Sequence, residues 1–186
     1  MAQDLFLTDV QTLRERAREL LERGAVTASY GGDVATAITL LQGVVATELV
    51  CVLRYSMHAI AVSGIHSESV GAEFAEHAEE ERRHMLAAAK RIDQLGGTPD
   101  FNPEGLALRS ATEYGDAACL IDMVRENLIA ERLVIEHYRE LIAYFGAGDP
   151  TTRILLERIL AEEEEHATDM HDLLVAHQGH PFLPAG

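Results

Sequence analysis

Lysine is almost missing from this sequence of 186 residues, in which Lys90 is the only one and the net charge is −16. Proteins that hold nucleic acid by its phosphates need clustered lysine and arginine side chains. The composition therefore argues against a nucleic-acid partner.

Tryptophan is absent, and Cys51 and Cys119 are the only cysteines. Both cysteines fall in segments that we predict to be helical, and so they do not indicate a structural disulfide. No signal peptide precedes Asp4 and Asp9, and we expect a reducing, cytoplasmic location.

Strand-like alternation is also missing, and the strongest apolar patterns repeat with a helical period. The most apolar segment, residues 38–65, is long enough to cross a membrane, but Glu48 and Arg54 interrupt it. We therefore predict an all-α protein without membrane insertion, of a size that can bury a full core.

Turn and capping signals divide the chain into a short extension and four long helices. Residues 8–23 are amphipathic and predict a short helix within an extension of residues 1–32, and residues 179–186 form a tail. Between them we expect a four-helix bundle over residues 33–178. Its helices are predicted at residues 33–63, 67–95, 110–145 and 149–178. Residues 98–109 contain two prolines and predict one long crossover between two helical hairpins.

Two copies of one acidic motif follow one another in the two hairpins. Within each copy a lone glutamate precedes a Glu-x-x-His motif by 33 or 32 residues, and the midpoint falls on a glycine turn signal. Residues equidistant from a hairpin turn lie at the same height, so all six side chains are expected in one layer of the bundle. The two copies are Glu48 with Glu81 and His84, and Glu131 with Glu163 and His166.

Four carboxylates and two imidazoles at this spacing describe a site for two metal ions. Glu and His three residues apart face the same side of a helix. This mixture of oxygen and nitrogen ligands suits iron, with manganese or zinc as substitutes, whereas structural zinc favours cysteines and calcium favours oxygen ligands on a loop. The plainer interpretation of the glutamate runs around Glu81 and Glu163 is a solvated acidic face. It fits Glu48 poorly, because an isolated carboxylate in an apolar run needs a strong partner.

Neighbouring residues leave some alternatives open. Glu80 and Glu162 lie four residues before the histidines and could also reach the same face, although we favour Glu81 and Glu163. Tyr55 and Tyr138 each follow a lone glutamate by seven residues and lean back toward the predicted layer. Tyr55 is either a core tyrosine or an electron donor and hydrogen-bond partner of a ligand, and Tyr138 has the same two interpretations.

Other polar residues near the motif carry weaker signals. Cys51 is either redox-active or a small apolar residue, and His58 is a candidate to support a ligand. Three further histidines have no matched partner and are expected at the surface or in a groove: His77, His137 and His171.

Residues 48–59, ELVCVLRYSMHA, together with the second lone glutamate and both Glu-x-x-His motifs, resemble bacterioferritin and its Dps-like relatives over about residues 33–176. The resemblance implies a ferritin-like bundle with a ferroxidase centre, in which Glu81 and Glu163 bridge two irons. Glu48 and His84 would complete one iron, and Glu131 and His166 the other, with Tyr55 beside them. Such proteins oxidise iron(II) with oxygen or hydrogen peroxide and commonly store the product in a hollow shell.

The chain also departs from bacterioferritin. Arg82 stands where bacterioferritin has its haem-ligating methionine, so no haem is expected. The short tail favours a dodecameric, Dps-like homo-oligomer over a larger shell. Glu76 and Glu80 lie where some bacterioferritins hold iron on their inner surface, and they are either such ligands or solvated side chains.

Two classes of alternative function share these features. The first is another di-metal enzyme on the same bundle: a rubrerythrin-like peroxidase, a manganese catalase or a di-iron hydroxylase. Rubrerythrin would require a carboxylate at Val134 and more cysteines, but ligand identity does not separate the other two. The second is a shell that sequesters metal without turnover.

Overall fold

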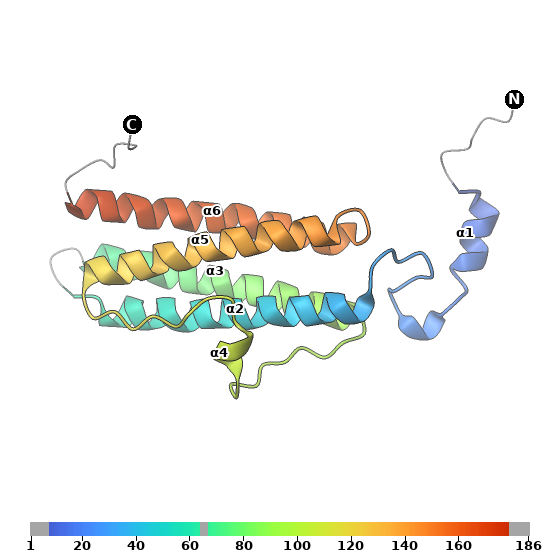
Figure 1. Ribbon diagram of the computed structural model, residues 1–186, viewed down its shortest axis with the longest axis horizontal. Helices are drawn as coiled ribbons and strands as arrows, with labels where there is room; N and C mark the ends of the chain where they lie inside the picture. The colour runs from blue at the N-terminus through green and yellow to red at the C-terminus, as the bar shows by residue number, and fades with distance from the viewer. Residues whose placement is uncertain (1–7, 64–66, 179–186) are drawn as a thin grey trace, which may run out of the picture.

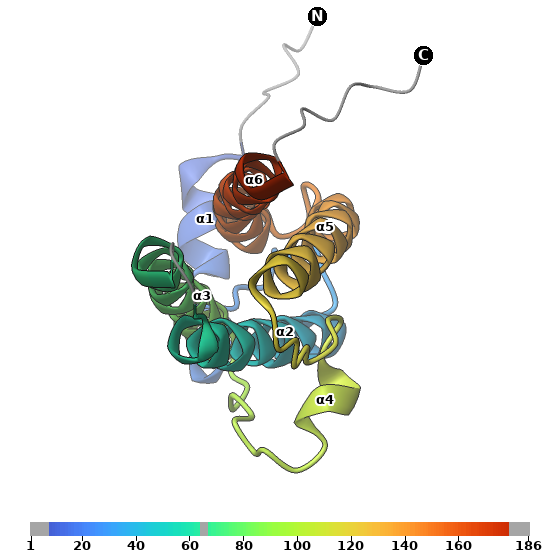
Figure 2. The same ribbon diagram turned by 90° about the vertical axis from the view of Figure 1, so that its left-hand side faces the viewer.

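The part of the chain that the structure describes has four long helices. They run alongside one another and form the body of the protein (Figure 1). The computed structural model describes residues 8–63 and 67–178. Helices α2 (Val34–Ala61) and α3 (Ser67–Gln94) form the first hairpin, and α5 (Leu120–Phe145) and α6 (Pro150–Gln178) form the second. Seen along their axes, the four helices stand at the corners of a square (Figure 2). No strand occurs in the described ranges, which confirms the predicted all-α bundle with one long crossover. The turn predicted at Gly64 lies outside the described residues.

Aspartates begin the first and last long helices. The Asp33 side chain accepts a hydrogen bond from the Ala35 amide, and Asp149 accepts one from the Thr152 amide. Each carboxylate thus satisfies an amide that has no partner within its helix. Pro150 follows Asp149 as the first residue of α6, where the missing amide hydrogen is harmless.

The prediction that the third long helix begins near Ser110 is wrong. Helix α5 begins at Leu120, and the crossover contains only the short helix α4 (Leu106–Arg109). The Ser110 hydroxyl donates to the Thr112 carbonyl instead of capping a helix. The Ala111 amide donates to Thr47 of α2, which holds this stretch of the crossover against that helix.

Cys119 directly precedes α5 and does not lie within a helix. The N-terminal segment is also less helical than predicted. Only α1 (Val10–Arg16) and a 3-10 turn (Leu21–Arg23) form. Leu20, directly before the 3-10 turn, adopts a left-handed conformation with φ 53°. Helix α1 lies apart from the four-helix body, beyond its end (Figure 1).

Two apolar clusters fill the bundle on either side of a polar layer. One cluster includes Leu41, Ile92 and Leu156, and the other includes Phe74, Met123 and Met170. Along each long helix, the residues of the repeated motif lie between members of these clusters.

Helix α2 is the one helix of the described ranges that is long and apolar enough to cross a membrane. Core helices of bundles pass the same test, and the interior face of α2 carries buried Glu48, Arg54 and His58. Packing in the bundle therefore explains the length and the apolar character of α2.

Candidate metal centre

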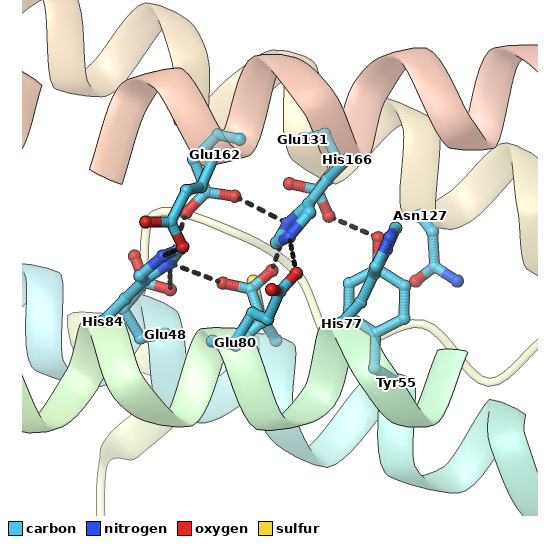
Figure 3. Close-up of polar contacts among 12 residues, drawn as sticks. Glu48, Tyr55, His77, Glu80, His84, Asn127, Glu131, Glu162 and His166 are labelled. Carbon is cyan, nitrogen blue, oxygen red and sulfur yellow. Dashed lines mark hydrogen bonds and ion pairs between the residues drawn. The ribbon is translucent and has the colours of Figure 1, made fainter. Parts of the chain in front are cut away.

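All six residues of the repeated motif come together in one buried layer. Figure 3 labels four of them, Glu48, His84, Glu131 and His166. The four carboxylates are completely buried, and each long helix contributes one. The two histidines are 4% and 2% exposed and come from α3 and α6. The members are Glu48, Glu81, His84, Glu131, Glu163 and His166.

The layer divides into two overlapping groups of potential ligands. Glu48 and His84 complete one group, and Glu131 and His166 complete the other, while Glu81 and Glu163 belong to both. Within each group the ligand atoms lie within 4.8 Å of one another. Two sites that share two carboxylates have the arrangement needed for a bridged pair of metal ions.

Each imidazole directs its Nδ1 atom toward the shared carboxylates. Nδ1 of His84 lies 3.1 Å from Glu163 and 3.4 Å from Glu81. Nδ1 of His166 lies 3.3 Å from Glu163 and 3.4 Å from Glu81. The two hairpins therefore contribute to the layer in matching ways.

Several buried polar atoms of this layer have no hydrogen-bond partner. Both carboxylate oxygens of Glu48 and of Glu81, one oxygen each of Glu131 and Glu163, and Nδ1 of His166 are in this position. Burying such atoms without partners is unfavourable, and a bound cation would satisfy them together. The donor set present thus fits a pair of divalent metal ions.

The other nitrogen of each imidazole is held by a carboxylate from the opposite hairpin. Nε2 of His166 lies 2.9 Å from Glu80, and Nε2 of His84 lies 3.0 Å from Glu162. An imidazole that donates from Nε2 keeps the Nδ1 lone pair for a metal. Glu80 and Glu162 therefore stand outside the ligand groups of the centre and orient its histidines.

The chain is similar to known proteins over most of its length. A family model described as "Ferritin-like domain" matches residues 38–178. The chain belongs to this ferritin-like family. Its relatives include the DNA protection during starvation protein of Pyrococcus furiosus, 28% identical over 171 residues, covering 86% of this chain and 85% of the relative. The nutrient stress-induced DNA-binding protein of Synechococcus is 31% identical over 118 residues, covering 62% of this chain and 67% of the relative.

Solved structures show the same ferritin-like arrangement. A protein of Bacteroides fragilis, described as a dodecameric thioferritin related to bacterioferritin, is 33% identical with a TM-score of 0.76 and covers 82% of this chain and 94% of its own. Dps from Thermosynechococcus elongatus has a TM-score of 0.72 at 20% identity, covering 75% of this chain and 90% of its own, and shows the fold alone.

Burial shapes the protonation of the ferritin-like layer. Desolvation and the neighbouring carboxylates raise the pKa of Glu48 and of Glu131 well above the ordinary value. Burial also opposes the ionisation of Glu81, but His166 and His84 outweigh it and lower the Glu81 pKa. Burial alone would lower the pKa of His84, whereas Glu163, Glu48 and Glu81 raise it. The metal-free layer therefore holds protons that a metal has to displace.

Tyr55 contacts the layer directly, as one of its two interpretations requires. Its hydroxyl donates a 2.6 Å hydrogen bond to Oε1 of Glu131, and the side chain is completely buried. Tyr138 is equally buried in an apolar cluster, but its hydroxyl has no hydrogen-bond partner. The two tyrosines share one spacing in the sequence but differ in hydrogen bonding, because only the Tyr55 hydroxyl has a partner.

A buried polar network adjoins Tyr55. Arg54 donates to Asn127 and to the Glu113 carbonyl, and Asn127 in turn contacts His58. Arg54 also donates a 3.4 Å contact to the Cys51 sulfur, and burial raises the pKa of that thiol. Burial thus disfavours the reactive thiolate form of Cys51, although the sulfur contacts a polar side chain.

The prediction that His77 lies at the surface or in a groove is wrong. It is 2% exposed, and its ring stacks on His166 with the centroids 4.1 Å apart. His171 is exposed as expected, and His137 is half-buried. The sequence signal for His77 was its place one turn before Glu81 on the same helical face.

Proposed function

We propose that this ferritin-like protein is a ferroxidase that oxidises iron(II) at a di-iron centre. One observation supports this most strongly: two buried ligand groups share Glu81 and Glu163 and contain carboxylate oxygens without partners. A solvated acidic face would expose these oxygens to water, whereas here all four carboxylates are completely buried.

The reaction needs two electrons from two iron(II) ions. Each ion loses one electron, and with two protons the pair reduces one hydrogen peroxide to two waters, or one oxygen to hydrogen peroxide. Iron supplies the redox chemistry when bound. Glu81 and Glu163 would bridge the ions, Glu48 and His84 would hold one, and Glu131 and His166 the other.

The remaining residues of the site would keep these ligands in position. Glu80 and Glu162 orient the histidines through Nε2, and Tyr55 holds Glu131. Ligands fixed on packed helices need little rearrangement as metal charge changes. Mixed oxygen and nitrogen ligation also allows manganese or zinc to substitute for iron.

We further propose that the protein stores or detoxifies iron as a homo-oligomeric shell in the cytoplasm, with twelve subunits favoured. The Bacteroides fragilis relative is described as dodecameric. Two curated relatives are named for DNA binding or DNA protection. The single lysine and the net charge of −16 argue against a DNA role for this chain.

The test is anaerobic loading with two equivalents of iron(II) per chain, followed by mixing with oxygen or peroxide. We expect a rapid ferric absorbance signal and a large hollow particle by mass measurement. Glu81→Ala should abolish the rapid phase with helical circular dichroism retained. A variant that oxidises iron at the unaltered rate would refute the assignment. Tight binding of two metals without oxidation would instead favour another di-metal enzyme or a sequestering shell.

A further inference from the structure

The two halves of the metal centre are built from equivalent positions of the internal repeat. A shift of 83 residues relates Glu48 to Glu131, and a shift of 82 residues relates His84 to His166. One half of the centre is completed by Glu48 and His84, and the other by Glu131 and His166. The side chains around the two halves can therefore be compared position by position.

One contact is the same in both halves. Glu80 lies 2.9 Å from Nε2 of His166, and its equivalent, Glu162, lies 3.0 Å from Nε2 of His84. These two carboxylates orient the histidines alike and do not distinguish the halves.

His77 is present on one side of the layer only. Its ring stacks on that of His166, with the centroids 4.1 Å apart and the planes 22° apart. The equivalent position on α6 is Ile159, a buried member of an apolar cluster. Isoleucine offers no flat ring against which His84 could stack.

The ring of His77 is itself held in place. Its side chain is 3% exposed, and its Nε2 atom lies 3.4 Å from Asp169 and 3.6 Å from Glu73. The ring of Tyr55 meets it at 85° with the centroids 5.2 Å apart. A buried ring that is packed against two others and held at one edge has little freedom to turn. His77 is therefore a firm support for the ring of His166.

Tyr55 provides a second difference between the halves. Its hydroxyl donates to Oε1 of Glu131 and leaves Oε2 of that carboxylate without a hydrogen bond. The hydroxyl of the equivalent Tyr138 has no hydrogen-bond partner, and neither has either carboxylate oxygen of Glu48. Figure 3 shows Tyr55 and His77 on the side of the layer where Glu131 lies, away from Glu48.

Such supports affect metal affinity. A ligand that is already fixed loses less conformational freedom when a metal binds, and so it binds the metal more tightly. Glu131 and His166 are each held by a neighbour that the equivalent ligands Glu48 and His84 lack.

We propose that His77 is a positioning residue that makes the half containing Glu131 and His166 the first to bind metal. The half containing Glu48 and His84 fills second and loses its ion first. This role rests on metal binding in the layer, as the proposed function does, but it does not depend on iron oxidation.

The first experiment is diffraction from crystals of the full-length assembled protein loaded with one equivalent of cobalt(II) per chain. Cobalt(II) accepts the same oxygen and nitrogen ligands as iron(II). Anomalous scattering at the cobalt edge measures the occupancy of each half. We expect at least about fivefold more cobalt beside Glu131 and His166 than beside Glu48 and His84. In His77→Ile, which copies the residue at the equivalent position, the ratio should fall to about one.

His77→Phe distinguishes a support from a ligand. Phenylalanine keeps a flat ring but has no nitrogen, so the occupancy ratio should stay within about twofold of that in the unaltered protein. Loss of the preference in His77→Phe would overturn the positioning role, and this holds even if His77→Ile fails to fold. Ile159→Val changes the equivalent position and is the matched control, in which the ratio should not change.

Calorimetric titration with cobalt(II) distinguishes positioning from a general loosening of the layer. His77→Ile should weaken the tighter of the two binding steps by about tenfold and leave the weaker step unaltered. Equal weakening of both steps would overturn the positioning role.

The outcomes separate this proposal from the ferroxidase proposal. Equal occupancy of the two halves in the unaltered protein, or an unaltered preference in His77→Ile, would overturn the role of His77 and leave the ferroxidase proposal standing. Ordered filling by cobalt(II) without oxidation of iron(II) would overturn the ferroxidase proposal alone. Failure of the layer to bind cobalt(II) would overturn both.

Discussion

Glu80 on α3 holds Nε2 of His166 on α6 at 2.9 Å, so the ring turns its Nδ1 atom toward the buried carboxylates. Glu162 does the same for His84 from the opposite side. Each hairpin thus orients the histidine of the other.

Glu80→Ala and Glu162→Ala should therefore weaken metal binding without removing a bridging ligand. Loss of a carboxylate that orients a ligating imidazole typically reduces affinity by about 10–100-fold. Metal titration of the two variants measures the loss. Glu79→Ala removes a neighbouring exposed carboxylate that pairs with Arg82, and it should leave affinity within about twofold of the unaltered protein. Equal losses in all three variants would indicate a general charge effect.

Tyr55→Phe and Tyr138→Phe form a matched pair, because both side chains are completely buried and only one hydroxyl has a partner. Removing the Tyr55 hydroxyl leaves Oε1 of Glu131 unsatisfied and should lower the free energy of unfolding by about 1–3 kcal/mol. Tyr138→Phe should change it by less than about 0.5 kcal/mol. Urea unfolding of the metal-free variants measures both. Similar losses would contradict the assigned hydrogen-bond partners.

Arg54→Met should loosen the crossover. The buried guanidinium joins α2 to Asn127 on α5 and to the Glu113 carbonyl, and the substitution leaves both acceptors without their donor. We expect a loss of about 3 kcal/mol in the free energy of unfolding, with faster proteolysis between α4 and α5. Arg82→Met, at an exposed position of α3, is the control and should unfold like the unaltered protein. Undiminished stability of Arg54→Met would show that the network contributes little.

Metal binding should strengthen as pH rises. The pKa values of Glu48 and Glu131 are raised by burial and like charge, and that of His166 is raised to about 12 by Glu163 and Glu81 against the effect of burial. A group whose pKa is raised by folding favours the folded metal-free protein most below its unfolded pKa, and this contribution falls as pH climbs toward the folded pKa. A metal competes with the same protons, so higher pH weakens that competition.

The difference in thermal midpoint between metal-loaded and metal-free protein should accordingly widen from pH 6 to pH 8. Thermal unfolding with and without cobalt(II) at each pH measures it. Glu140→Gln, which lies away from the layer, should show the same widening. A constant difference would mean that these residues are not protonated in the metal-free layer.

The spacing of the repeated motif follows helical geometry. It therefore predicted both the bundle and the layer in which its six residues lie. Their identity as metal ligands remains a prediction. Ser110 resembles a helix cap in sequence, but α5 does not begin there. The Ser110 hydroxyl donates to the carbonyl of Thr112, two residues further on, and the Ala111 amide donates to Thr47 of α2. Contacts with a helix far away in the chain determine this outcome, and they leave no local pattern.

The misplacement of His77 has a different cause. The position equivalent to His77 in the second copy of the repeat is Ile159, so the repeat does not distinguish this histidine as a functional residue. Its burial follows from the stacking against His166 on α6, which depends on how the two hairpins meet. The spacing places His77 on the same helical face as Glu81, but it does not predict the contact with His166 across the two hairpins.

The shared carboxylates have a mechanical consequence. Neighbouring helices pack far more extensively within each hairpin than between the hairpins. Each ligand group nevertheless takes side chains from both hairpins, with Glu81 on one side and Glu163 on the other. A loaded centre would act as a reversible crosslink across the seam between the two halves. The resistance of the folded subunit to unfolding would then depend on how much metal it carries. In a metal-free subunit, the two hairpins would separate from each other first.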